Sequence, residues 1–122
     1  MSETRFHGIY PSTVLPMRAD FSTDWEAYAK HTAHCVMRPG IRGVLINGHA
    51  GENYVITRAE KRRAVAVTRA TLDATRLIVA GVNAESSLEA AEEAREACAA
   101  GADAIMVFLP NAFALAHTTA MA

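Results

Sequence analysis

Three short apolar runs constrain most strongly what this chain can fold into. They lie at residues 44–47, 77–80 and 104–108, and their apolar residues follow one another without polar alternation. Strands of a parallel sheet have this composition when both of their faces are covered by other elements. A fourth run, at residues 9–15, is similar but is interrupted by Pro11. The runs therefore predict four parallel strands, of which the last three are buried on both faces.

Helical patterns lie between the runs, and local signals mark where these helices begin and end. Asp24 is a good N-cap residue, and Pro39 and Gly40 are expected to end the helix that it opens. Residues 57–60 and 86–89 have the form of capping boxes, which open two further helices. The second of these helices is rich in alanine and is expected to end at Gly101. Strands and helices thus alternate, as in the α/β class.

The spacing of the runs sets the possible architectures. The strands start near residues 9, 44, 77 and 104, which are 35, 33 and 27 residues apart. This is close to the length of a βαβ unit, about 30 residues. Two arrangements satisfy the pattern: a small open sheet with helices on both faces, or half of an eight-stranded β/α barrel, which usually has about 250 residues. Periodicity alone does not choose between them.

Composition and charge argue against several classes of function. The 12 basic and 13 acidic residues give a net charge of −1, whereas proteins that bind nucleic acids or membrane surfaces have a basic excess or stripe. Cys35 and Cys98 are far apart and have no cluster of metal ligands, so both are expected to be buried or half-buried thiols. The N-terminus has no signal-peptide pattern, and no apolar run reaches the roughly 18 residues of a membrane span. We therefore expect a soluble, cytoplasmic protein with no nucleic-acid or membrane partner.

Five motifs, in order along the chain, resemble the dihydrodipicolinate synthase and N-acetylneuraminate lyase family. Residues 48–52, Gly-His-Ala-Gly-Glu, directly follow the second run and are similar to the family's Gly-Thr-Thr-Gly-Glu turn. The other motifs lie at residues 8–17, 56–62, 80–87 and 101–110. The resemblance extends from Gly8 to Leu115, nearly the whole chain. It implies that residues 1–122 are one partial domain, the first four β/α units of a (β/α)8 TIM barrel with parallel strands.

The resemblance also implies an activity. Members of the family are lyases of the class I aldolase type, which form a Schiff base between a lysine and the keto group of pyruvate or a related 2-keto acid. They use neither a metal nor an organic cofactor. The lysine belongs on the sixth strand and a catalytic tyrosine on the fifth, outside the four units seen here. Lys30 and Lys61 fall in helical patterns, on the outer ring of a barrel, so neither is expected to form the imine.

The turn at residues 48–52 is the candidate site. In the family this turn binds the substrate carboxylate through backbone N–H groups, which implies this role for Gly48, His49, Ala50 and Gly51. His49 and Ala50 are expected to act through their amides, and the glycines to let the ligand approach the backbone. Glu52 is expected to order the turn through hydrogen bonds. The alternative is a glycine turn that only links a strand to a helix.

The side chains of the site depart from the family pattern. His49 and Ala50 stand where the family has two hydroxyl side chains, the first of which relays protons. Because histidine changes its charge near neutral pH, His49 is the candidate catalytic proton relay. A tyrosine that enters a neighbouring subunit's site in many relatives is replaced here by Ala112 or Phe113. These changes predict a divergent subgroup.

We therefore predict the N-terminal part of a Schiff-base lyase, or of a sugar-acid dehydratase, that is inactive by itself. Its partner is a small 2-keto acid, and a complete barrel is expected to be a homo-oligomer. The alternative is a non-catalytic half-barrel that binds a small carboxylate or dimerises, since two copies would supply eight strands and remove the exposed sheet edges. An unrelated small α/β domain is the third alternative, and the five ordered motifs disfavour it.

Overall fold

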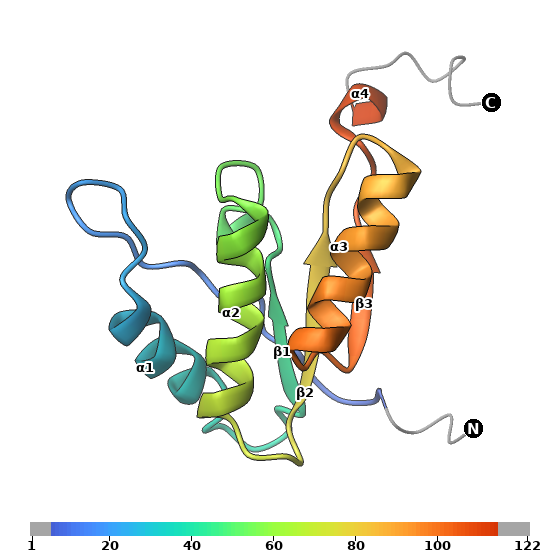
Figure 1. The fold of residues 1–122 in the computed structure, drawn as a ribbon. Coiled ribbons are helices and arrows are strands. Elements are labelled where there is room, and N and C mark those ends of the chain that lie inside the picture. The colour runs from blue at the N-terminus through green and yellow to red at the C-terminus, as the bar shows by residue number, and fades with distance from the viewer. Residues whose placement is uncertain (1–5, 115–122) are drawn as a thin grey trace.

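The computed structural model describes residues 6–114, and residues 1–5 and 115–122, among them Leu115, lie outside the described part (Figure 1). Helices and strands alternate along the chain as the sequence predicts. The elements are α1 (Trp25–Cys35), β1 (Gly43–Ile46), a 3-10 turn (His49–Gly51), α2 (Arg58–Thr71), β2 (Leu77–Val82), α3 (Ser87–Ala100), β3 (Ala104–Val107) and α4 (Asn111–Ala114).

The strands form one parallel sheet in the order β1-β2-β3. Val44 of β1 pairs with Ile78 of β2, and Val79 of β2 pairs with Ala104 of β3. Each crossover contains one helix, α2 or α3, as expected for consecutive βαβ units. The carboxyl ends of the strands therefore meet at one edge of the sheet, which lies at the top of Figure 1.

The first predicted strand is present as an extended segment beside β1 and not as a regular strand. Ile9 and Ser12 form isolated parallel bridges with Ile41 and Leu45. The Leu45 N–H donates to the carbonyl of Pro11, and the Leu45 carbonyl accepts from the N–H of Thr13, with both N···O distances at 2.9 Å. Pro11 has no N–H to donate, so the ladder is interrupted at this point. The fourth parallel element is therefore confirmed in position and direction, while its regular pairing is not.

The helices cover one face of the sheet. The larger core cluster joins strand residues to residues of α2 and α3; it contains Val36, Val44, Ile46, Val65, Leu72, Ile78, Ala80 and Ala97. Leu45, Val79 and Met106 alternate with these strand residues and therefore point to the opposite face. Leu45 and Val79 are half-buried, and Met106 is 43% exposed. The prediction that the strands are buried on both faces is wrong for the described residues, because no element packs on that second face.

The predicted helix boundaries are largely confirmed. Thr57 and Glu60 form a complete capping box at the start of α2. At the start of α3, the Ser86 hydroxyl accepts a hydrogen bond from the Glu89 N–H, which is half of the predicted capping box. Gly101 ends α3 with φ 118°, a left-handed conformation that suits glycine. Helix α1 ends at Cys35, a few residues before Pro39 and Gly40, where the sequence predicted its end.

Both cysteines are free, and only one has the predicted burial. Cys35 is half-buried, as expected, whereas Cys98 is exposed. Ala97, the preceding residue on α3, is the one that packs into the core, so Cys98 is turned toward solvent. Within residues 6–114, none of the helices is long and apolar enough to cross a membrane.

Candidate active site

The candidate site begins where β1 ends. Asn47, the residue after β1, is buried and adopts a left-handed conformation with φ 53°, which turns the chain sharply out of the sheet. Its side-chain amide donates a hydrogen bond of 3.0 Å to the carbonyl of Lys61 in α2. Asparagine tolerates this backbone conformation better than most residues, because its short polar side chain can bond locally. Asn47 therefore anchors the turn at residues 48–52 to the helical layer.

The backbone of the turn leaves two N–H groups without a partner in the described part of the chain. The carbonyl of Gly48 accepts from the N–H of Gly51 at 3.0 Å, and the carbonyl of His49 accepts from the N–H of Glu52 at 3.1 Å. His49 and Ala50 are the first two residues of the 3-10 turn, where N–H groups have no intrahelical acceptor. Neither N–H has a hydrogen-bond partner among the described residues, and both residues are exposed. These are the two amides that the sequence predicted for carboxylate binding.

The side chain of His49 lies in an aromatic cluster. Its Nε2 is 2.7 Å from the hydroxyl of Tyr54, and its ring centroid is 4.6 Å from that of Phe108. Phe108 directly follows β3, and it reaches His49 because Gly81 of β2 has no side chain. A Cβ at Gly81 would lie 2.8 Å from the Phe108 ring and 2.2 Å from the carbonyl oxygen of Asn47. The carboxyl ends of all three strands thus contribute to the surroundings of His49.

Glu52 closes the turn through its backbone. It adopts a left-handed conformation with φ 62°, and its carbonyl accepts from the N–H of Val55 at 3.0 Å. Its carboxylate is exposed and has no hydrogen bond or ion pair within residues 6–114. The carboxylate also lines an open hollow of about 460 Å³ together with Met17, Phe21, Val55, Ile56 and Glu60. A role of the Glu52 side chain in ordering the turn stays a prediction.

The two lysines are held by carboxylates. Lys30 is exposed, and its ammonium lies 2.7 Å from Glu26 on the same helix. Lys61 lies on α2 as predicted, but it is buried against α3, with its ammonium 2.9 Å from the carboxylate of Glu93. Each lysine nitrogen is therefore paired with a carboxylate. No group of three or more histidine, cysteine or acidic residues in the described part could hold a metal ion.

Sequence reasoning found the turn and missed three residues that shape it, Asn47, Tyr54 and Phe108. Asn47 and Phe108 directly follow predicted strands, so the rule that parallel strand ends converge could have identified them. Tyr54 lies five residues beyond His49, and no periodic pattern in the sequence connects the two. The backbone N–H groups of Asn111 and Ala112 donate to the carboxylate of Glu85 at 2.7 and 3.2 Å, which holds the start of α4. The side chain of Phe113 lies outside the described part.

The fold has close counterparts among solved structures. It superposes on a putative dihydrodipicolinate synthase family protein of Coccidioides immitis with a TM-score of 0.79 and 28% sequence identity, covering 84% of this chain and 34% of that one. For a dihydrodipicolinate synthase of Agrobacterium tumefaciens, the TM-score is 0.76 and the identity 32%, over 85% of this chain and 35% of the other. The sequence matches the dihydrodipicolinate synthetase family over residues 5–116. The chain belongs to this family.

Relatives in the dihydrodipicolinate synthetase family are considerably longer. An uncharacterised DapA-like lyase of Halobacterium salinarum is 32% identical over 115 residues, which are 94% of this chain and 38% of that protein. A 4-hydroxy-tetrahydrodipicolinate synthase of Methanothrix thermoacetophila is 30% identical over 105 residues, 86% of this chain and 35% of that protein. The chain thus spans about a third of the length of lyases in its family. The predicted fold, an N-terminal part of a TIM barrel, is confirmed.

Proposed function

We propose that this chain is the carboxylate-binding part of a lyase that forms an imine with pyruvate or a related 2-keto acid. The observation that carries the proposal is the pair of adjacent N–H groups of His49 and Ala50 at the carboxyl edge of the sheet, which have no hydrogen-bond partner within residues 6–114. Family membership supports it, because relatives of this chain are named 4-hydroxy-tetrahydrodipicolinate synthases. The imine lysine would come from a later strand of the barrel.

The geometry of the turn suits a carboxylate. Two adjacent N–H groups at the start of a 3-10 turn can each donate to one carboxylate oxygen, and such charge-assisted hydrogen bonds are stronger than neutral ones. The flanking Gly48 and Gly51 carry no side chain that could cover these donors. A 2-keto acid held in this way would have its keto carbon directed away from the turn, toward the part of the barrel that supplies the lysine.

The proposal can be tested by following backbone amide signals by NMR while pyruvate is added to the chain. His49→Pro removes one of the two donors, and proline suits the first position of a helical turn. The preceding Gly48 is extended, with ψ −172°, which is the conformation favoured before proline. The matched control, His49→Ala, removes the imidazole and keeps the N–H, so the difference between the two variants isolates the donor.

We expect the amides of His49 and Ala50 to shift most in the unmodified chain. A hydrogen bond to a charged group contributes about 1.5–3 kcal/mol, so His49→Pro should weaken pyruvate binding by about tenfold or more relative to His49→Ala. Borohydride should trap no pyruvate adduct on either lysine. Lys30 is exposed and lacks the desolvated surroundings that activate an imine-forming lysine, and Lys61 is buried against the carboxylate of Glu93. Equal affinity of the two variants would show that the turn does not bind the carboxylate.

One observation favours the alternative of a half-barrel that dimerises. Strand β3 is at an edge of the sheet, so its outer backbone groups are available for pairing. Apolar side chains at this edge are exposed: Met106 by 43%, Val107 by 67% and Leu109 by 64%. A second copy of the chain that added its first extended segment to this edge would cover these residues.

A further inference from the structure

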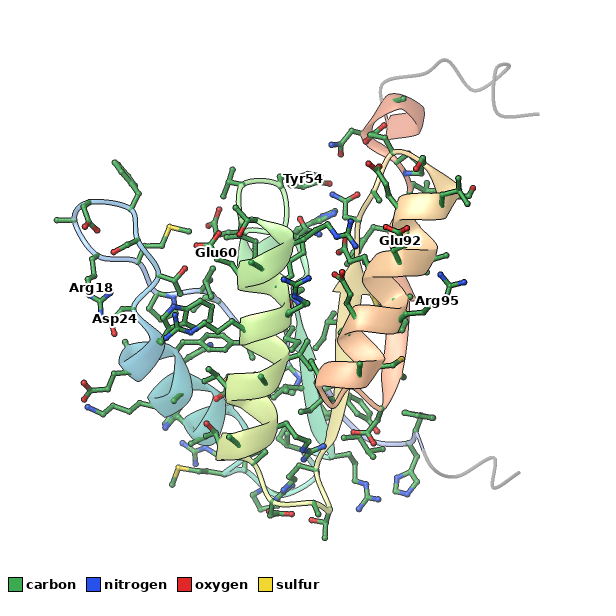
Figure 2. The ribbon with its side chains drawn as sticks, viewed as in Figure 1. Arg18, Asp24, Tyr54, Glu60, Glu92 and Arg95 are labelled. Atoms are coloured by element: carbon green, nitrogen blue, oxygen red, sulfur yellow. The ribbon has the colours of Figure 1, made fainter. Side chains whose placement is uncertain are left out.

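We propose that Tyr54 and His49 form a proton-transfer pair, in which Tyr54 exchanges a proton with the bound ligand and His49 passes it on. The inference deepens the proposed function and depends on it for the identity of the ligand. It rests on the hydrogen bond of 2.7 Å between the Tyr54 hydroxyl and Nε2 of His49. Figure 2 shows Tyr54 on the loop before α2, at the edge of the sheet where the strands end.

The hydrogen bond between Tyr54 and His49 can have either direction. The phenol donates to Nε2 when the neutral imidazole carries its hydrogen on Nδ1, and it accepts from Nε2 in the other tautomer. The proposed transfer starts from the first arrangement, with the Tyr54 hydroxyl as the donor, and ends in the second.

The His49 ring is held in place from two sides. Its centroid lies 4.8 Å from the Tyr54 ring and 4.6 Å from the Phe108 ring, with interplanar angles of 32° and 31°. Phe108 belongs to the end of β3 and packs over Gly81 of β2, so the sheet itself fixes this support. Proton transfer depends on such positioning, because the donor and acceptor must stay within hydrogen-bond reach.

The pair is also accessible beside the carboxylate-binding turn. Tyr54 is 52% exposed, and His49 is exposed and supplies one of the two N–H groups of the turn from its own backbone. The proposal places a ligand bound to these amides beside the phenol. Ala50 and Ala112 have no hydroxyl to offer, so Tyr54 is the hydroxyl that the described structure places against His49.

The transfer is balanced without any other reactant than water. A ligand hydroxyl gives its proton to the Tyr54 oxygen, the Tyr54 proton moves to Nε2 of His49, and the proton on Nδ1 leaves to water. The ligand becomes an oxyanion, while the pair remains a neutral phenol and a neutral imidazole of the other tautomer. The reverse sequence returns a proton to the ligand.

The first measurement is the tautomer of His49, read from the nitrogen NMR shifts of chain labelled in its histidine rings, at a pH where the ring is neutral. We expect the Nδ1–H form in the unmodified chain. Tyr54→Phe keeps the ring stacking and removes the hydroxyl, so it should shift the ring toward the Nε2–H form. The control is Tyr10→Phe, because the buried Tyr10 hydroxyl has no hydrogen-bond partner in the described structure. An unchanged tautomer in Tyr54→Phe would overturn the hydrogen-bond direction on which the pair depends.

The second measurement is proton transfer itself. Pyruvate exchanges in water with its hydrate, and loss of water from the hydrate requires one hydroxyl to give up a proton and the departing hydroxyl to take one. Exchange between the two methyl signals measures this rate by NMR and needs no imine lysine. We expect the chain to accelerate it over buffer. A positioned acid–base group contributes about 10²-fold or more, so Tyr54→Phe should lose at least tenfold of the acceleration, with Tyr10→Phe unchanged.

The same samples distinguish pyruvate binding from proton transfer. If Tyr54→Phe retains the pyruvate-induced amide shifts and loses the acceleration, Tyr54 acts in proton transfer and not in binding. If the unmodified chain and Tyr54→Phe accelerate the exchange equally, or if neither accelerates it, the proposed pair is wrong. This holds whatever the affinity of the two proteins for pyruvate. Loss of the amide response in His49→Pro bears only on the carboxylate site.

Discussion

The buried ion pair between Lys61 and Glu93 holds α2 against α3. The ammonium and carboxylate are 2.9 Å apart, and the two side chains are only 8% and 7% exposed. The Lys61 ammonium also donates to the backbone carbonyl of Asn83 at 3.4 Å, and the Asn83 N–H donates to the same Glu93 carboxylate at 3.4 Å. The pair therefore connects both helices to the end of β2, close to the candidate site.

Lys61→Met should be strongly destabilising. The variant keeps the aliphatic volume but leaves the Glu93 carboxylate in the interior with only the 3.4 Å bond from Asn83. Breaking a buried ion pair from one side costs about 3–5 kcal/mol, because an uncompensated charge remains. A domain of this size is stable by about 5–15 kcal/mol, so the variant should lose a large part of its free energy of unfolding.

Two further variants separate the effect of burial from that of losing a lysine. Lys30→Met removes an ion pair of similar length, 2.7 Å, whose side chains are 75% and 79% exposed, and we expect no resolvable change. The double variant Lys61→Met with Glu93→Leu removes both charges. It should recover most of the stability lost in Lys61→Met, since apolar replacements of buried pairs are often neutral or better.

Urea denaturation followed by far-UV circular dichroism measures all of these free energies. We expect a low midpoint for Lys61→Met, a midpoint close to that of the unmodified chain for Lys30→Met, and a midpoint for the double variant well above that of Lys61→Met. Equal midpoints for the two single lysine variants would show that burial does not govern the effect. A double variant no more stable than Lys61→Met would show that the two charges do not compensate each other.

Two other predictions concern the capping box of α2 and the edge of the sheet. The Thr57 backbone N–H holds the pKa of Glu60 below its ordinary value of 4.5; this contribution to stability is complete above pH 4.5 and is lost as the pH falls through the lower pKa of the folded state. Glu60→Gln should therefore differ most from the unmodified chain near neutral pH, and urea denaturation at neutral and acidic pH checks this; a difference that does not change with pH would contradict it. If β3 pairs between two copies, sedimentation should give a species of twice 13.1 kDa, and Val107→Lys, which puts a charge at a residue that is 67% exposed in the single chain, should return it to the monomer. A 13.1 kDa species at every concentration would show that the half-barrel dimer is wrong.

The local elements of this protein follow from its sequence because each depends on residues a few positions apart. The apolar runs correspond to β1, β2 and β3, and the caps at Thr57, Ser86 and Gly101 bound α2 and α3 as predicted. The glycine turn at residues 48–52 lies directly after β1, where its motif placed it. Family motifs added the barrel architecture, which periodicity had left open beside an open sheet.

Only the tertiary structure decided which distant residues meet. The sequence did not indicate that the His49 ring would contact both Tyr54 and Phe108. Nor did it indicate that Lys61 would form a buried ion pair with Glu93, which is 32 residues away. It also predicted that Cys98 would be buried or half-buried and that both faces of β3 would be covered. Both predictions were wrong, because burial depends on which neighbouring elements cover a surface. Local periodicity determines which elements form, whereas the path of the chain around the sheet determines the distances between side chains on different elements.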